Sequence, residues 1–134
     1  MKRWMTIGVL GLASVWGLAR GGYGEPREAL QDFMRVKLKD SQNVLEGLVL
    51  DDFDKIAKNS QDMSLLTLAE TWQVLNTPQY VEYSRKFRNA TDTLTEMAKK
   101  RNLEGATMAY NLVTVKCVEC HKYVRDVRMA GLAK

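Results

Sequence analysis

The residues of this chain best suited to chemistry lie in one short segment near the C-terminus, Cys117-Val118-Glu119-Cys120-His121. The pattern C-x-x-C-H is the attachment sequence of a c-type haem. On a helix, two thiols three residues apart share a face and can reach the two vinyl groups of one porphyrin, and the histidine projects from the same side. Neutral histidine is a standard proximal ligand of haem iron. The segment therefore predicts one covalent haem c on Cys117 and Cys120, with His121 as the proximal iron ligand.

Three other uses of these residues fit the sequence less well. A zinc site takes four ligands, and the whole chain has two cysteines and one histidine. A thiol-disulfide enzyme usually carries C-x-x-C at a helix N-terminus, where the helix dipole lowers the thiol pKa, whereas this motif lies inside a predicted helix. A structural disulfide is possible in an oxidising compartment, but thiols three residues apart on one helix are poorly placed to form it.

The N-terminal residues have the pattern of a secretory signal peptide. Lys2 and Arg3 form a short positive segment, and residues 7–19 form an apolar run that ends in small residues. This run is shorter than the roughly 20 apolar residues of a membrane-spanning helix. The pattern predicts export to the bacterial periplasm, with cleavage after Ala19 or, at a second candidate site, as late as residue 24. An uncleaved membrane anchor is the alternative.

The chain then divides into residues 1–19 as signal peptide, residues 20–25 as a short linker and residues 26–134 as one cytochrome domain. The formal net charge of the full chain is +4, and removal of two basic residues with the signal peptide leaves +2. No basic patch suggests nucleic-acid binding. After cleavage we expect no attachment to a membrane.

Caps and breaks predict four helices after the linker. Pro26 suits the first position of a helix, Asp51 can cap a second helix, and Thr77-Pro78 combines a cap with a first-position proline. Residues 102–105 form the last break, and the apolar pattern of the second helix extends to Trp72. Four helices of roughly 20 to 27 residues with short links predict an all-α fold, an antiparallel four-helix bundle.

The fourth predicted helix carries apolar residues at alternating steps of three and four: Leu103, Ala106, Tyr110, Val113, Cys117, Cys120, Val124 and Val127. Such a seam faces the core of a bundle, so the haem should be bound near the C-terminal end of this helix. In the first helix the apolar series is Leu30, Met34, Leu38, Leu45 and Leu48. We expect this series, together with Ser41, to form the inward face.

Taken together, these features resemble the class II c-type cytochromes, the cytochrome c-prime family. The resemblance covers residues 25–128 and rests on an exported four-helix pattern with C-x-x-C-H near the C-terminus. It implies a haem packed along the bundle, with Arg125, and Lys122 as a second candidate, near a propionate; ordinary surface charge is the alternative for both. It also implies a homodimer through the first two helices. The aromatic residue after the histidine is Tyr123, one position earlier than in the family pattern.

The residue opposite His121 decides between two functions found in this family. Members with a methionine ligand are six-coordinate electron carriers, and members with an apolar residue there keep an open site for small gases. The family pattern places this residue four positions after an arginine, which here is Lys39. Matching depths along antiparallel helices favours Met34 as the second iron ligand. An open site beneath Leu38 or Met34 is the alternative, and Lys37 or Lys39 is the least favoured ligand.

We therefore expect an exported mono-haem electron carrier, not an enzyme, that meets other periplasmic redox proteins transiently. A five-coordinate protein that binds nitric oxide or carbon monoxide is the second hypothesis. The third comes from another class of protein: a thiol-disulfide oxidoreductase that uses Cys117 and Cys120. A haem stain on a denaturing gel separates the third hypothesis from the first two.

Overall fold

The computed structural model describes residues 26–69, residue 75 and residues 77–132, and all regular secondary structure within them is helical. The helices are α1 (Pro26–Leu50), α2 (Phe53–Leu66), α3 (Pro78–Lys99) and α4 (Leu103–Leu132). The predicted all-α fold of four helices is confirmed. The predicted signal peptide and linker lie outside the described residues.

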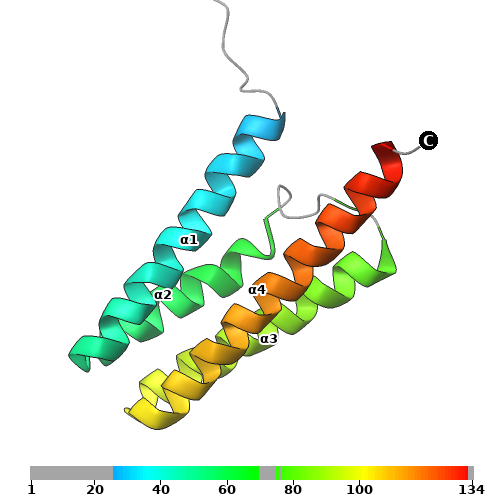
Figure 1. Cartoon of the computed structure of the whole chain (residues 1–134). Coiled ribbons are helices and arrows are strands. Elements are labelled where there is room, and N and C mark those ends of the chain that lie inside the picture. The colour runs from blue at the N-terminus through cyan, green and yellow to red at the C-terminus, as the bar shows by residue number, and fades with distance from the viewer. Residues whose placement is uncertain (1–25, 70–74, 76, 133–134) are drawn as a thin grey trace, which may run out of the picture.

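Each helix runs back along the one before it, so the four helices form an antiparallel bundle (Figure 1). Helix α2 packs closely on α1 and on α3, and α3 packs closely on α4, whereas α1 and α4 contact each other far less. The bundle therefore has three tight interfaces and one wide one. Within the part of the chain that the structure describes, no helix has the length and apolar content needed to cross a bilayer.

Helix α2 is shorter than the sequence pattern predicts. It has 14 residues and ends at Leu66, and Trp72, to which the pattern extends, lies outside the described residues. Thr67 closes the helix, because its hydroxyl donates a hydrogen bond to the carbonyl oxygen of Ser64 at 2.7 Å. As a result, the first turns of α1 extend past the end of α2 (Figure 1).

The helix N-termini follow the sequence in one case and differ by one residue in another. Helix α2 is capped by Asp52 rather than Asp51, since the Asp52 carboxylate accepts a hydrogen bond from the backbone N–H of Lys55 at 3.0 Å. Asp51 instead adopts a left-handed conformation, with φ of 54°, in the tight turn after α1. The predicted start of α3 is confirmed, with Thr77 as the cap and Pro78 as the first helical residue.

The core lies along the three tight interfaces. Its largest fully buried apolar side chains are Ile56, Met63, Leu94, Val44 and Val113. The predicted seam of α4 is confirmed, because every residue of that series is buried or half-buried. Met108 and Val115, on other faces of the same helix, are exposed. The seam thus turns both cysteines of α4 toward the inside of the bundle.

The inward face of α1 differs from the predicted one. Leu45 is 50% exposed, so its predicted place on the inward face is wrong, and Leu38 is 59% exposed. Lys37 and Val44 are buried instead, and Ser41 is half-buried between them. Successive helical residues are rotated by about 100°, so this face lies one residue away from the apolar series. The apolar pattern did not predict this face because two of the residues on it, Lys37 and Ser41, are polar.

Candidate cofactor groove between α1 and α4

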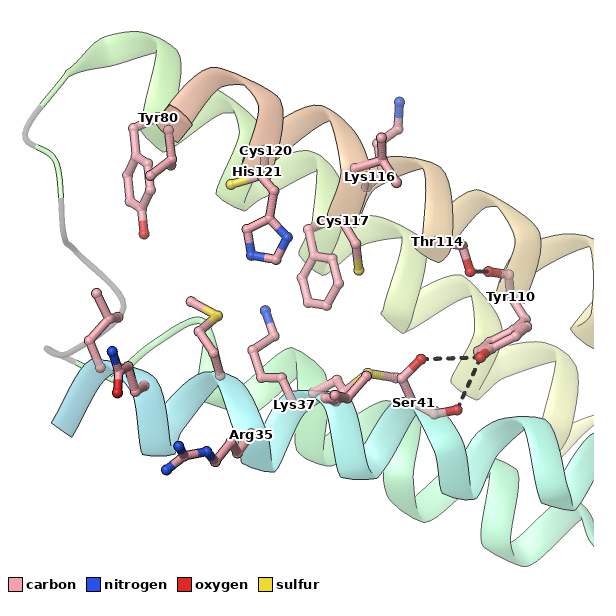
Figure 2. A pocket seen from close by; sticks show the side chains of 18 of the residues that line it. Arg35, Lys37, Ser41, Tyr80, Tyr110, Thr114, Lys116, Cys117, Cys120 and His121 are labelled. Atoms are coloured by element: carbon pink, nitrogen blue, oxygen red, sulfur yellow. Dashed lines mark hydrogen bonds between the residues drawn. The ribbon is translucent and has the colours of Figure 1, made fainter. Parts of the chain in front are cut away.

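The wide interface between α1 and α4 holds a groove of about 710 Å³ with a mostly apolar lining. This volume falls within the roughly 300–1,000 Å³ range of pockets that bind small molecules and cofactors. Helices α1 and α4 supply the two walls, while Met63 of α2 and Phe87 of α3 line the groove between them. The close-up of the groove shows the two walls facing each other (Figure 2).

All three residues of the predicted haem motif line this groove on the α4 side. Cys120 is buried and Cys117 is half-buried, and the side chain of His121 points from α4 toward α1 (Figure 2). Burial raises the pKa of both thiols, while the positive charge of Lys37 acts in the opposite direction. The net effect favours the protonated, uncharged thiols at neutral pH.

The imidazole of His121 is favoured in its neutral form. His121 as a whole residue is exposed, but partial burial of its ring in the groove is the largest cause that lowers its pKa, and the positive charges of Lys37 and Arg125 lower the pKa further. Neutral imidazole carries the nitrogen lone pair that binds a metal. The electrostatics of the groove therefore favour the form of His121 that can act as an iron ligand.

Helix α1 brings a lysine into the same space. Lys37 is only 8% exposed, and no other charged side chain in the described part of the chain is buried. Its Nζ lies 3.6 Å from the centroid of the Phe87 ring. Figure 2 shows its amine end directed across the groove toward His121. Burial lowers the pKa of Lys37 to about 7, although Cys117 and Cys120 act to raise it.

The other residues predicted to lie opposite His121 differ in their position relative to the groove and in their exposure. Met34 lines the groove and is half-buried. Leu38 lines the groove as well, with more than half of its surface exposed. Lys39 is exposed and is not among the lining residues. The structure therefore brings Met34, Leu38 and the whole haem motif to one groove.

The basic residues expected near a propionate are arranged differently. Arg125 is exposed and is not among the lining residues, although it is close enough to influence the pKa of His121. Lys122 belongs to a smaller hollow between α3 and α4. Arg128 lines the groove itself, so it is better placed than Arg125 and Lys122 to meet an acidic group of a ligand there. Arg35 also borders the groove, but its guanidinium pairs with the Asp32 carboxylate at 2.6 Å and extends away from the groove (Figure 2).

Tyr123 has a structural role away from the groove. Its hydroxyl oxygen lies 2.8 Å from the hydroxyl oxygen of Thr77, the cap of α3. Its ring packs on the ring of Tyr83, with centroids 5.4 Å apart. These contacts fasten the C-terminal half of α4 to α3. They help to fix the wall of the groove that carries the haem motif.

One end of the groove is closed by a direct link between its walls. The hydroxyl of Tyr110 on α4 donates a hydrogen bond to the backbone carbonyl oxygen of Ser41 on α1, at 3.1 Å, and lies 3.2 Å from the Ser41 hydroxyl (Figure 2). Both residues line the groove. The link sets how closely α1 approaches α4.

Sequence reasoning gave Lys37 little weight, but a signal for it was present. Counting back from Leu48 in alternating steps of four and three gives Val44, Ser41, Lys37, Met34 and Leu30. These positions are buried or half-buried in the structure. The same rule identified the seam of α4. The same spacing of alternating three- and four-residue steps, applied to α1 without regard to hydrophobicity, places Lys37 in the groove.

Comparison with known proteins finds no match. No protein-family model matches the chain, and neither a curated protein nor a solved structure does. Within the described residues, no group of three or more His, Cys, Asp or Glu side chains is placed to hold a metal ion by itself. The resemblance to class II c-type cytochromes therefore stays a hypothesis based on the motif and its position.

Proposed function

We propose that this chain is an exported c-type cytochrome that carries electrons through one covalent haem. The observation that carries the proposal is that Cys117, Cys120 and His121 line one cofactor-sized groove inside a helical bundle. The donor set fits the group: two uncharged thiols for thioether bonds, and a neutral imidazole one helical turn after the first thiol. The same spacing on an exposed surface would leave a porphyrin in water.

In the proposed protein each wall has a separate task. Cys117 and Cys120 form the two thioether bonds, and His121 binds the iron from the α4 side. When bound, the haem supplies an iron that alternates between the ferric and ferrous states. The apolar side chains of Met63 and Phe87 would shield a bound haem from water on the sides of α2 and α3, and burial of this kind would tune its reduction potential.

One charged residue of the lining suits the periphery of such a cofactor. Arg128 lies on the α4 wall of the groove, whereas the guanidinium of Arg35 on α1 is already paired with Asp32. Arginine pairs well with carboxylates because its planar guanidinium can donate two parallel hydrogen bonds. We propose Arg128, ahead of Arg125, as the partner of a haem propionate. The proposed physiological partners are other exported redox proteins that bind transiently.

The thiol-disulfide alternative is less well supported by the environment of the cysteines. A redox-active dithiol needs a thiolate, which a lowered thiol pKa provides. Here burial raises the pKa of both Cys117 and Cys120. Both residues also lie far from the N-terminus of α4, which begins at Leu103, so the helix dipole gives them no help.

A haem assay tests the proposal directly. The full-length chain is produced in a host with a c-type haem attachment system, and the periplasmic fraction is run on a denaturing gel. We expect one haem-staining band, about one haem per chain by mass, and an N-terminus between Arg20 and Glu25. A haem-free chain, or haem that acid acetone extracts from the wild-type protein, would contradict the proposal.

Variants of the motif make the test specific. The double variant C117A/C120A should lose covalent haem, and H121A should lose the normal haem spectrum. Val115→Ala is the matched control, because Val115 lies on the same helix close to the motif, is exposed and does not line the groove. It should keep both the haem stain and the spectrum. Equal staining of C117A/C120A and wild type would show that the cysteines do not hold the haem.

A further inference from the structure

The buried position of Lys37 is unusual for a lysine on a bundle helix. Lysine is almost never fully buried, since its ammonium group loses hydration there. Nevertheless Lys37 is buried, while Lys39 on the same helix is exposed. The ring of Phe87 lies 3.6 Å from its Nζ and offers a cation–π contact. Such a contact can hold the ammonium group at the wall of the groove, where it can serve a function.

The direction of the Lys37 side chain indicates what that function is. Its amine end points across the groove toward His121, with Cys117 beside it (Figure 2). The charge of Lys37 influences the pKa values of Cys117, Cys120 and His121, the three residues of the haem motif. A cofactor bound by those three residues would therefore have the Lys37 amine on the side of the iron that faces α1.

The two alternatives on α1 are less well placed for this role. Leu38 has no donor atom and is mostly exposed. Met34 has a thioether and lines the groove, but it lies almost one helical turn before Lys37, or about 4.5 Å along the axis. Met34 is also only half-buried, and methionine commonly fills space in a core.

We propose that Lys37 is the sixth, distal ligand of the haem iron, opposite His121. The inference rests on the proposed function, because it requires the covalent haem. On ligation the ammonium group of Lys37 releases one proton to solvent, and the freed nitrogen lone pair forms the bond to iron. No electron is transferred in this step. The protein would then supply two nitrogen ligands to the iron, from His121 and Lys37, and leave no open site on the iron for gases. Met34 would be a packing residue.

Spectroscopy of the holoprotein tests the ligand without any substitution. Ferric wild-type holoprotein should be low-spin, with electron paramagnetic resonance and near-infrared magnetic circular dichroism signals of imidazole–amine ligation. Signals of imidazole–thioether ligation would overturn the inference in favour of Met34. A high-spin wild-type protein that binds carbon monoxide at once would overturn it in favour of an open site.

Three leucine variants locate the ligand on α1. K37L should convert the haem to a mostly high-spin form and allow rapid binding of carbon monoxide. K39L, the matched control for loss of a lysine, should leave the wild-type spectrum unchanged, and so should M34L. A low-spin spectrum in K37L that is lost in M34L would overturn the inference. Loss of covalent haem from the wild type would instead refute the proposed function, so the two failures are distinguishable.

Discussion

The hydroxyl oxygen of Tyr110 lies 3.1 Å from the backbone carbonyl oxygen of Ser41, and the two residues join α4 to α1 across an interface where these helices make few other contacts. The link lies at one end of the groove, while the cysteines lie further along α4. Its hydrogen bonds are half-buried, so water competes with them only partly. It therefore sets the width of the groove as well as contributing to stability.

Tyr110→Phe removes this link without removing the ring. We expect the free energy of unfolding to fall by about 1 kcal/mol, the typical net value of one hydrogen bond. Denaturant titration followed by circular dichroism measures the change. Tyr83→Phe is the control, since the hydroxyl of Tyr83 has no hydrogen bond within the described residues and its ring contact with Tyr123 remains. Equal losses for both variants would contradict a role for the Ser41 link.

Gly47 allows α1 to approach the start of α2 closely. A Cβ added at this position would lie 2.8 Å from Cγ1 of Ile56 and 3.1 Å from the carbonyl oxygen of Asp52. Ile56 is fully buried and the carbonyl is backbone, so neither can move freely. Although alanine is ordinarily the better helix former, we expect Gly47→Ala to destabilise the protein by about 1 to 3 kcal/mol through overpacking.

Gly131 provides the matched control for that substitution. It lies in the last turn of α4, and an added Cβ would meet no atom within 4 Å. Helix propensity alone then acts, and Gly131→Ala should leave stability unchanged or raise it by up to about 1 kcal/mol. Thermal unfolding of both variants is the measurement. A Gly47→Ala variant as stable as Gly131→Ala would contradict the close approach of the two helices.

A buried pair of hydroxyl groups joins α2 to α3. The hydroxyl oxygens of Ser60 and Thr95 are 2.7 Å apart, and Thr95 also donates to the carbonyl oxygen of Thr91 at 3.0 Å. In a double-mutant cycle of Ser60→Ala and Thr95→Val, we expect a coupling energy of about 0.5 to 1.5 kcal/mol in the free energy of unfolding. Strictly additive losses would show that the two hydroxyls do not stabilise each other.

The burial of Lys37 predicts a pH dependence of stability in the haem-free chain. Burial lowers its pKa from 10.5 to about 7 in the folded chain. Between these values the unfolded chain holds a proton at Lys37 that the folded chain has released, so stability rises with pH. The slope approaches about 1.4 kcal/mol per pH unit within this window. Below about pH 7 the full cost of burying the charge is present.

Lys37→Met isolates this effect, because it keeps the length of the side chain and removes the charge. The described groups around Lys37 include the thiols of Cys117 and Cys120 on α4 and the Phe87 ring on α3, and the charge of Lys37 in turn acts on His121. Burial lowers the pKa of His121 and raises the pKa values of both thiols, which moves these titrations away from the pH range in which Lys37 loses its proton. Between pH 7 and 8.5 the wild type should therefore gain stability relative to Lys37→Met. Parallel curves for the two proteins would contradict the prediction.

The fold could be predicted where hydrophobicity and position coincide. In α4 every residue of the seam is apolar or a cysteine, so the period was visible and both cysteines were correctly placed inside the bundle. In α1 the same geometry holds, but Lys37 and Ser41 occupy inward positions. The apolar residues of α1 therefore predict an inward face with Leu38 and Leu45, one residue away from the face that is buried in the structure.

For the candidate site, the sequence likewise predicts the wall on α4 but not the wall on α1. The residues of the motif could be named from sequence because their spacing within one helix is local. The opposite wall could not, since it depends on how α1 is rotated about its own axis against α4. That rotation is fixed by packing on α2, such as the 2.8 Å hydrogen bond from Asn43 to Asn59. Neither residue carries a sequence signal of its own.

The wide interface between α1 and α4 also has a consequence for the order of assembly. Asn43 and Asn59 are 16 residues apart, and Ser60 and Thr95 are 35 apart, but Ser41 and Tyr110 are 69 apart. Closing a longer loop costs more entropy, so the α1–α4 pairing is the last to form. Helix α1 comes first in the chain, but its contact with α4 forms only after the other helices have paired. Until α1 closes over it, the C-x-x-C-H segment therefore stays open on this side, which would give access to the machinery that attaches the proposed haem.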